Sequence, residues 1–350
     1  MSLTIVSVAY PLAPVGPDSV GGSEQILATM DHALVAAGHR SIVVANSDSV
    51  VQGELMSFPA PSHGAPITAE STAAIKASLE AALAQALRLR PDVVHMHGLD
   101  FHEHLPPPGP PVLASLHLPA DWYPSWAFEL ARPDTWLAPV SHSQAALCPP
   151  SPALLDPVPN GVPVDLLGLS RARRCGFTLM LARVCPEKGL HLALQAAHAA
   201  DVPLWIGGEL FPYPWHQEYF EREVRPLLDH DRRWLGPLGF ARKRRLLRAA
   251  RCLLIPSLVD ETSSLVAMEA ASCGTPVIAF RRGALPETVE DGRTGILVDD
   301  EMQMAAAIRD IGSIDPATCR AVARARFGRD RMAAQYLALY RQLAERRLAA

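Results

Sequence analysis

Residues 252–280 most constrain the fold, because they contain the parts of a strand–loop–helix–strand unit. The unit begins with CLLIP, a short apolar run that ends in proline. Such a run is typical of a buried strand. Thr262 and Ser263 can then cap a helix whose apolar side chains share one face. Gly274 ends this helix, and Pro276–Phe280 starts another apolar run. Such units build parallel α/β sheets.

The same stretch offers a place for an anion. The backbone amides of Ser263, Ser264 and Leu265 come free at the start of the predicted helix, where such amides bind phosphate. Glu261 and Glu269 flank this position, and carboxylates beside a phosphate would repel it. They therefore need another role, such as accepting hydrogen bonds from sugar hydroxyls.

These residues resemble the signature of the family 4 retaining glycosyltransferases: a Glu, seven residues, a second Glu, and a small-residue run ending in CGTPV. The resemblance implies that Glu261 holds the donor sugar, that Glu269 holds the ribose, and that the helix amides hold the diphosphate. The family usually has Gly-Phe-Gly-Leu after the first Glu, where this chain has Thr-Ser-Ser-Leu. The predicted sugar pocket is therefore atypical. Without CGTPV, the two glutamates would indicate only an acidic helix start and a solvent-facing helical residue.

Apolar runs alternate with helical patterns along the chain, which predicts doubly wound parallel sheets. The further predicted strands are 3–9, 40–45, 92–96, 112–116, 136–140, 177–181, 203–206, 233–235 and 296–298. The further predicted helices are 25–37, 69–89, 190–199, 300–310, 316–326 and 331–347. Residues 50–66 show no clear periodicity.

The resemblance implies the GT-B fold, an α/β architecture of two facing Rossmann-like domains with a cleft between them. We expect an N-terminal acceptor-side domain over residues 1–165, joined by a C-terminal helix, 329–350, that crosses back to it. A nucleotide-sugar-binding domain is expected over residues 172–326, after a linker at 165–174. The sequence PNGV at 159–162 resembles the motif that closes the first domain of the family, and Asn-Gly is also a turn signal by itself.

Arg183 and Lys188 lie across a predicted strand-to-helix loop, where they could clamp one diphosphate. They could equally be two exposed basic residues, but matching family positions imply the diphosphate role. Gly21 and Gly22 form a pair that lets backbone approach a ligand closely, or that only allows a turn. The resemblance implies that this pair lines the cleft near the donor phosphates.

The remaining site residues follow other predicted strands. His117 comes at the carboxyl end of a strand, where open α/β sheets bind ligands, although it could simply cap the strand. The resemblance implies that His117 contacts the donor sugar and shares the catalytic role with Glu261. It also implies that a loop with Leu235, Gly236 and Leu238 reads the nucleotide base through its backbone. A further set is aromatic and is expected on the acceptor side, unless it belongs to the core: Trp122, Tyr123 and Trp126.

Two patterns suggest a metal by spacing alone. The first is a pair of H-x-H sequences, formed by His95, His97, His102 and His104. No Cys pair or H-E-x-x-H lies nearby, and the family commonly has histidine there without metal. The second is a D-x-D at residues 229–231, which supports metal-dependent sugar-nucleotide binding in a different fold class. We predict no metal and no bound cofactor, with a nucleotide-diphosphate sugar as co-substrate.

Composition limits the partners and the location. The net charge of −4 argues against a general nucleic-acid partner. Basic runs at 242–248 and 341–347 are expected to be solvated helix faces, with contact to anionic lipid as the alternative. No apolar run spans a bilayer, the start lacks a charged signal region, and the six cysteines are scattered. A cytoplasmic protein with reduced cysteines is therefore expected.

Together these features predict a metal-independent retaining transferase that moves a sugar, most readily from a UDP- or GDP-sugar, to a hydroxyl of a small molecule or glycan. The Pro-, Ala- and Arg-rich sequence is similar to glycosyltransferases of antibiotic pathways. Three alternatives stay open. They are a sugar-nucleotide epimerase, a phosphorylase with lysine-bound pyridoxal phosphate, and a sugar-nucleotide-binding protein without turnover.

Overall fold

The computed structural model describes residues 2–60, 68–168 and 174–349 of the protein. The chain divides into two compact units. Unit 1 comprises Met1–Asn160 and Asp330–Ala350, and unit 2 comprises Gly161–Arg329. Part of the predicted linker, residues 169–173, lies outside the described residues, and its earlier part contains the short helix α4 (Val164–Leu167).

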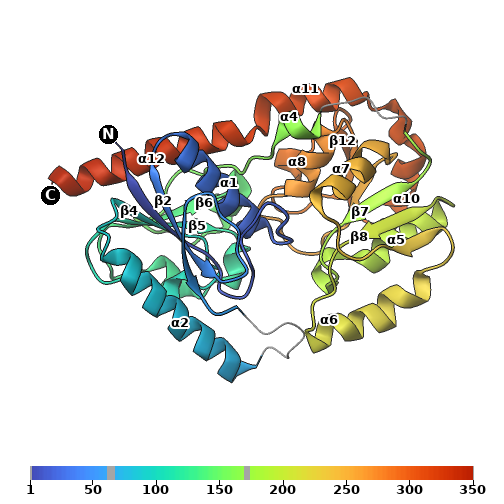
Figure 1. Ribbon diagram of the computed structural model, residues 1–350. Helices are drawn as coiled ribbons and strands as arrows, with labels where there is room; N and C mark the ends of the chain where they lie inside the picture. The colour runs from blue at the N-terminus through green and yellow to red at the C-terminus, as the bar shows by residue number, and fades with distance from the viewer. Residues whose placement is uncertain (1, 61–67, 169–173, 350) are drawn as a thin grey trace. The chain divides into compact units, whose positions relative to one another are not determined.

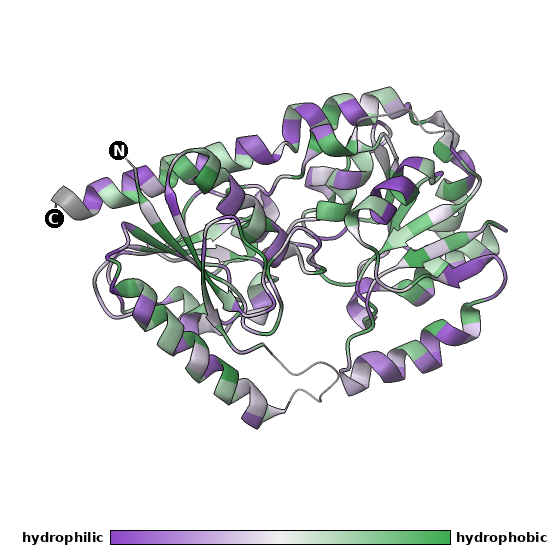
Figure 2. Ribbon diagram, viewed as in Figure 1, coloured by the Kyte–Doolittle hydropathy of each residue, from purple (hydrophilic) through white to green (hydrophobic). Residues whose placement is uncertain are grey.

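Unit 1 contains a parallel sheet that, in the described residues, has six strands in the order β3-β2-β1-β4-β5-β6. Its strands are β1 (Thr4–Val8), β2 (Arg40–Asn46), β3 (Glu54–Phe58), β4 (Val93–Met96), β5 (Val112–Leu116) and β6 (Thr135–Pro139). Its helices are α1 (Gly22–Ala36), α2 (Ala69–Leu87), α3 (His142–Leu147) and α12 (Arg329–Ala349), with the 3-10 turns η1 (Phe101–Glu103), η2 (Ala120–Trp122) and η3 (Ser125–Phe128). The inner strands are apolar (Figure 2), as the runs that predicted them are, and their apolar side chains are buried.

One strand of unit 1 was not expected. β3 lies within residues 50–66, where no periodicity is visible, and it pairs with β2 from Ile42 opposite Glu54 to Asn46 opposite Phe58. β3 is the edge strand, so most of its side chains reach solvent and only Phe58 is buried. An edge strand can therefore lack the apolar pattern that marks an inner one.

Helix α12 belongs to unit 1, which confirms the expected return of the C-terminal helix to the first domain (Figure 1). Tyr336 and Tyr340 from this helix are fully buried. The hydroxyl of Tyr340 lies 2.6 Å from Nδ1 of His95 in β4, and the hydroxyl of Tyr336 lies 2.7 Å from Oγ of Ser115 in β5. These buried hydrogen bonds join the last helix to the first sheet.

Unit 2 repeats the architecture, with six parallel strands among its described residues in the order β12-β11-β10-β7-β8-β9. They are β7 (Thr178–Leu181), β8 (Leu204–Gly207), β9 (Arg232–Trp234), β10 (Leu253–Ile255), β11 (Val277–Phe280) and β12 (Gly295–Val298). The α-helices besides α4 are α5 (Leu190–Ala199), α6 (Pro214–Tyr219), α7 (Phe240–Ala249), α8 (Leu265–Ser272), α9 (Leu285–Thr288), α10 (Glu301–Asp310) and α11 (Pro316–Arg326). Shorter turns are η4 (Pro186–Lys188), the π-helical η5 (Phe220–Val224), η6 (Arg225–Leu227) and η7 (Ile311–Ser313).

Apolar side chains form two cores in unit 2. One core includes buried residues of α5 and α10, and the other includes buried residues of α7, α8 and α11. A parallel sheet needs both faces covered, and these helices provide the cover. The predicted α/β fold of two Rossmann-like sheets is therefore confirmed.

Strand order locates the ligand edge of each sheet. In unit 2 the chain runs from β7 outward to β9 and then returns to place β10 on the other side of β7. In unit 1 the same reversal falls between β1 and β4. Ligands of open α/β sheets bind at such switch points, outside the carboxyl ends of the strands.

Candidate functional site

The switch point of unit 2 brings together two loops, which carry the predicted donor-site residues Arg183, Lys188, Glu261, Ser263 and Ser264. One loop follows β7 and leads to Gly189, and the other follows β10 and leads to α8. The amide of Leu258 donates to the carbonyl of Glu187 over 2.8 Å, which ties the loops together. Gly189 has a φ of +65°, and a Cβ there would lie 2.3 Å from the carbonyl oxygen of Pro256. Only glycine allows this close approach.

Lys188 and Glu261 are in direct contact in this loop pair. Nζ of Lys188 lies 2.5 Å from Oε1 of Glu261, and the two side chains are 23% and 11% exposed. Ser257, which sequence reasoning did not single out, donates its hydroxyl to the same carboxylate oxygen. Lys188, which could bind a phosphate, therefore neutralises Glu261, which could accept hydrogen bonds from sugar hydroxyls. Arg183 is exposed and makes no ion pair within the described ranges.

Glu269 is a buried carboxylate with one oxygen paired and one unpaired. Nζ of Lys243, from α7, lies 2.6 Å from Oε1, and the side chain of Glu269 is 3% exposed. Oε2 is buried and lacks a hydrogen-bond partner in the described structure. Burial raises the pKa of Glu269, and Lys243 acts in the opposite direction. The free oxygen can accept a hydrogen bond from a ligand hydroxyl.

In the basic run at 242–248, Arg242 and Arg245 are exposed, as a solvated face requires, but Lys243 is not. Its charge is committed to Glu269, and the neighbouring Arg244 donates to the carbonyl of Leu166 over 3.0 Å. The sequence carries no signal for the Lys243–Glu269 pair, because the partners are 26 residues apart and only the packing of α7 beside α8 joins them.

Helix α8 begins later than the capping residues predicted from sequence. Its N-cap is Ser264, with no side-chain cap, and its first residue is Leu265. Thr262 and Ser263 remain outside the helix because the preceding turn is held elsewhere: the amide of Ala284 donates to the carbonyl of Glu261 over 2.7 Å. The free amides of the helix therefore begin around Leu265. The hydroxyl of Ser263 is buried without a partner in the described structure.

The loop predicted to read the base is held by its backbone. The amide of Leu235 donates to the carbonyl of Ile206 over 2.8 Å, and the carbonyl of Gly236 accepts from the amide of Gly208 over 2.9 Å. Gly236 has a φ of +71° with open space where a Cβ would be. Leu238 packs against Gly207, since a Cβ on that glycine would lie 2.3 Å from its Cδ1. The assignment of these residues to the base stays a prediction.

His117 occupies the corresponding edge of unit 1, just after β5. Its amide and that of Leu118 both donate to the hydroxyl of Tyr123, over 3.0 and 3.1 Å. Tyr123 is 6% exposed and belongs to the core, whereas Trp122 and Trp126 are 44% and 51% exposed. The three aromatics grouped in the sequence analysis therefore separate: Tyr123 positions the His117 loop, and the two tryptophans remain available for an acceptor.

Three histidines of unit 1 lie together, with His95 and His97 buried and His117 half-buried. Nδ1 of His97 lies 3.3 Å from Nε2 of His117. Both ring nitrogens of His95 contact hydroxyls, from Tyr340 and from Ser115 (2.8 Å). Burial lowers the pKa of His117 to about 4 and the pKa of His95 and His97 well below the ordinary value. The three rings are therefore neutral at pH 7, and His95 has no ring nitrogen left for a zinc ion.

The second H-x-H lies beside a lysine. Nδ1 of His104 is 3.2 Å from Glu80, and Nε2 of the same ring is 3.4 Å from Asp100. Lys76 pairs with Asp100 and Glu103 over 3.2 and 2.5 Å. The lysine charge already occupies the place that a cation would take among these carboxylates.

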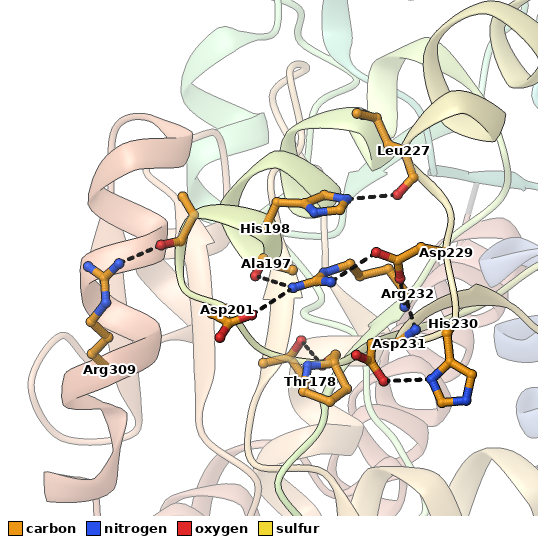
Figure 3. Close-up of polar contacts among 12 residues, drawn as sticks. Thr178, Ala197, His198, Asp201, Leu227, Asp229, His230, Asp231, Arg232 and Arg309 are labelled. Carbon is orange, nitrogen blue, oxygen red and sulfur yellow. Dashed lines mark hydrogen bonds and ion pairs between the residues drawn. The ribbon is translucent and has the colours of Figure 1, made fainter.

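The D-x-D sequence has a structural role at the start of β9 (Figure 3). Oδ1 of Asp229 accepts from the amides of Asp231 and Arg232, and its Oδ2 accepts from the Arg232 guanidinium over 2.9 Å. Asp231 lies 3.1 Å from His230. The oxygens of Asp229 are therefore occupied by the turn that starts the strand.

Gly21 and Gly22 start helix α1, as its N-cap and its first residue. A Cβ on Gly21 would lie 1.8 Å from Oε2 of Glu24, so the glycine makes room for this buried carboxylate. Oε1 of Glu24 accepts from the hydroxyl of Ser23 over 2.9 Å. Gly21 is thus needed for packing, and its proposed contact with donor phosphates is a separate prediction.

The chain has the GT-B fold, as comparison with solved structures shows. The structure matches sucrose-phosphate synthase from Thermosynechococcus elongatus with a TM-score of 0.77 and 21% identity, covering 97% of this chain and 99% of that one. It matches Anabaena HepE in complex with UDP-glucose with a TM-score of 0.74 and 18% identity, covering 99% and 100%. AviGT4, a glycosyltransferase involved in avilamycin A biosynthesis, gives 0.70 and 23%, covering 98% of each chain. At these identities the likeness shows the fold alone.

Two glycosyltransferase family models match the chain, one in each half. Residues 20–166 match the model described as Glycosyltransferase Family 4, and residues 176–313 match Glycosyl transferases group 1. The chain is therefore a glycosyltransferase of the family 4 type, as its sequence motifs predicted.

Curated relatives match over shorter segments. D-inositol 3-phosphate glycosyltransferase of Mycolicibacterium vanbaalenii is 47% identical over 73 residues, which is 20% of this chain and 16% of the relative. The protein of the same name from Acidothermus cellulolyticus is 44% identical over 112 residues, 29% of this chain and 24% of the relative. The match thus spans about a sixth to a quarter of the length of these relatives.

Proposed function

We propose that this protein transfers a sugar from a nucleotide-diphosphate sugar to a hydroxyl of a small-molecule or glycan acceptor, with retention of the anomeric configuration and without a metal ion. The observation that carries the proposal is the arrangement at the switch point of unit 2. There the Lys188–Glu261 pair and the half-paired Glu269 flank the start of α8. The lysine and the helix amides suit the diphosphate oxygens of such a donor, and the carboxylates suit its hydroxyls.

The proposed reaction depends on stabilising the charge that develops on the departing diphosphate. Arg183, Lys188 and the first amides of α8 supply positive charge and hydrogen-bond donors for it. When Lys188 turns to the diphosphate, Oε1 of Glu261 becomes available to a hydroxyl of the donor sugar. Glu269 accepts from the ribose through its free oxygen, with Lys243 fixing the other one.

Acceptor activation is proposed without a covalent enzyme intermediate. The acceptor hydroxyl attacks the face from which the diphosphate leaves, and the departing phosphate oxygen takes the proton of that hydroxyl. His117 would orient the donor sugar as a neutral hydrogen-bonding group, because burial holds its pKa near 4. Trp122 and Trp126 would contact the acceptor.

We propose UDP-sugars as the first donors to test and GDP-sugars as the second. A fold neighbour of this chain, HepE, has been solved with UDP-glucose. The avilamycin enzyme motivates an aglycone acceptor of the antibiotic type, and the curated relatives motivate an inositol phosphate. Free cysteines at all six positions, each of them in a described range, favour a reducing compartment such as the cytoplasm.

The chain's lysines bear on the phosphorylase alternative. The sequence holds three lysines, Lys76, Lys188 and Lys243, and each one pairs with a carboxylate in the described structure. A lysine that binds pyridoxal phosphate as a Schiff base must react as a free amine. These pairings disfavour a phosphorylase and leave the epimerase and the non-catalytic binder as the alternatives to test.

The test is a transfer assay with UDP-glucose, UDP-galactose and GDP-mannose against a panel of sugars, inositol phosphate and polyketide-type aglycones. We expect nucleotide release that depends on one class of acceptor, an α-linked product from an α-linked donor, and a large loss of rate in Glu261→Gln. The matched control is Glu221→Gln, an exposed glutamate of unit 2 that pairs with Arg225. Acceptor-independent formation of an epimerised sugar would indicate the epimerase, and tight binding without turnover would indicate the binder.

A further inference from the structure

A second group of ligand-type side chains lies in unit 2 and has no part in the proposed transfer reaction. Cys185 and Glu187 come from the loop after β7, and His216 comes from α6. Each of the three offers one ligand atom, and these atoms lie within 4.8 Å of one another. Cys185 and His216 are 3% and 5% exposed.

The histidine of this group lacks a protein partner on one side. Nδ1 of His216 is buried without a hydrogen-bond partner in the described ranges. The thiol of Cys185 donates a long hydrogen bond of 3.7 Å to the carbonyl of Arg183 and also interacts with the carboxylate of Glu187. A buried polar atom without a partner destabilises the fold, and a ligand that bound to it would remove this cost.

From this geometry we infer a zinc site formed by Cys185, Glu187 and His216. Thiolate, imidazole and carboxylate are the ligands that Zn²⁺ takes in proteins. In a tetrahedral zinc site, bonds of about 2.0–2.3 Å place the ligand atoms about 3.3–3.8 Å apart. A movement of about 1 Å would bring this group to that spacing.

Charge supports a divalent ion at this site. The thiolate of Cys185 and the carboxylate of Glu187 would together neutralise Zn²⁺, leaving the imidazole as a neutral third ligand. The nearby cations are Arg183, which is exposed, and Lys188, which already pairs with Glu261. The other His-containing group, at Asp100, differs because Lys76 stands within it.

Bound zinc would link α6 to the loop that holds Arg183 and Lys188. Three protein ligands of one unit would join two segments about 30 residues apart in sequence, with water in the fourth position of a tetrahedral site. Because zinc would bind the folded unit, it should raise the melting temperature of the protein in a concentration-dependent way. The inference does not depend on the proposed sugar transfer, and it can be tested without any nucleotide.

The experiment is a zinc titration of the full chain after removal of metal with a chelator, in competition with a chromogenic zinc dye. We expect one zinc per wild-type chain. We also expect Co²⁺ to give the near-ultraviolet absorption of a cobalt–thiolate bond. Cys185→Ser should abolish that band and the zinc equivalent, His216→Ala should abolish the zinc equivalent, and Glu187→Gln should weaken zinc affinity at least tenfold.

The matched control is Cys175→Ser, which alters an exposed cysteine of the same unit and should keep both signals. Circular dichroism and metal-free melting temperatures check that the variants fold. If a variant fails to fold, the wild type still tests the inference. Chemical modification of Cys185, located by peptide mapping, should then abolish the cobalt–thiolate band. The inference is overturned if wild type takes up no stoichiometric zinc, or if Cys185→Ser retains the cobalt–thiolate band.

Discussion

Replacing Glu269 with glutamine tests the part of the site that sequence reasoning could describe only by resemblance. The change removes the charge paired with Lys243 at 2.6 Å and keeps the shape and one acceptor oxygen. A hydrogen bond between a ligand hydroxyl and a charged acceptor contributes about 1.5–3 kcal/mol, against about 0.5–1.5 kcal/mol for a neutral one. The difference of about 1–2 kcal/mol corresponds to roughly 5- to 30-fold weaker binding of the nucleotide.

Stability should fall as well, because Lys243 loses its partner. Breaking a fully buried ion pair from one side costs about 3–5 kcal/mol. The side chain of Lys243 is 15% exposed and can turn toward water, so we expect a smaller loss of about 1–3 kcal/mol. Urea unfolding followed by circular dichroism gives this value, and titration calorimetry with UDP or the preferred diphosphate gives the affinity.

The pH dependence separates Glu269 from other groups. Burial raises its pKa above the ordinary value of 4.5, so lowering the pH protonates it while most carboxylates are still charged. Affinity for the nucleotide should therefore fall on acidification from neutral pH toward 4.5, and this part of the fall should be missing in Glu269→Gln. Unchanged affinity in the variant, with unchanged affinity in the control Glu221→Gln, would refute the ribose assignment.

Three further predictions concern other residues. Lys188→Met should lower kcat at least tenfold in the transfer assay because it removes charge from the departing diphosphate. A kcat within twofold of wild type would contradict that role. Tyr340→Phe leaves Nδ1 of His95 without its partner and should lower the free energy of unfolding by about 1–3 kcal/mol in urea, whereas a loss below 0.5 kcal/mol would show that the bond contributes little. His117 keeps a neutral ring in the folded state down to about pH 4, while its unfolded ring takes up a proton near pH 6.5. The free energy of unfolding should therefore rise with pH between about 4 and 6.5. In His117→Gln, calorimetry should show a less steep rise of the same free energy. An equal slope in the variant would show that His117 does not contribute.

The regular elements could be predicted because their signals are local. Buried inner strands are short apolar runs, and the helix Leu190–Ala199 appears in the structure with the predicted limits. The edge strand β3 escaped prediction because its side chains face solvent. The start of α8 was placed too early because the turn before it is held by Ala284, a tertiary contact that residues 260–265 do not reveal.

Within the site, sequence identified single residues and missed their partners. Glu261 and Glu269 could be chosen from their spacing and the CGTPV run, but Ser257 and Lys243 enter only through the folded arrangement of loops and helices. Tyr123 could not be distinguished from its neighbouring tryptophans, because its burial depends on the core of unit 1.

Among the helices of the described ranges, none has both the length and the apolar character required to cross a bilayer.

The most direct test of the proposed donor site is a thermal-shift panel with UDP, GDP, ADP and dTDP. It should be run on the wild type, on Arg183→Ala, and on Arg222→Ala as a matched exposed arginine of the same unit. A ligand that binds the folded protein raises its melting temperature. We expect one diphosphate to raise it in the wild type and in Arg222→Ala, with the shift lost or strongly reduced in Arg183→Ala. No shift with any diphosphate, or an equal shift in Arg183→Ala, would contradict a nucleotide-sugar site at the switch point of unit 2.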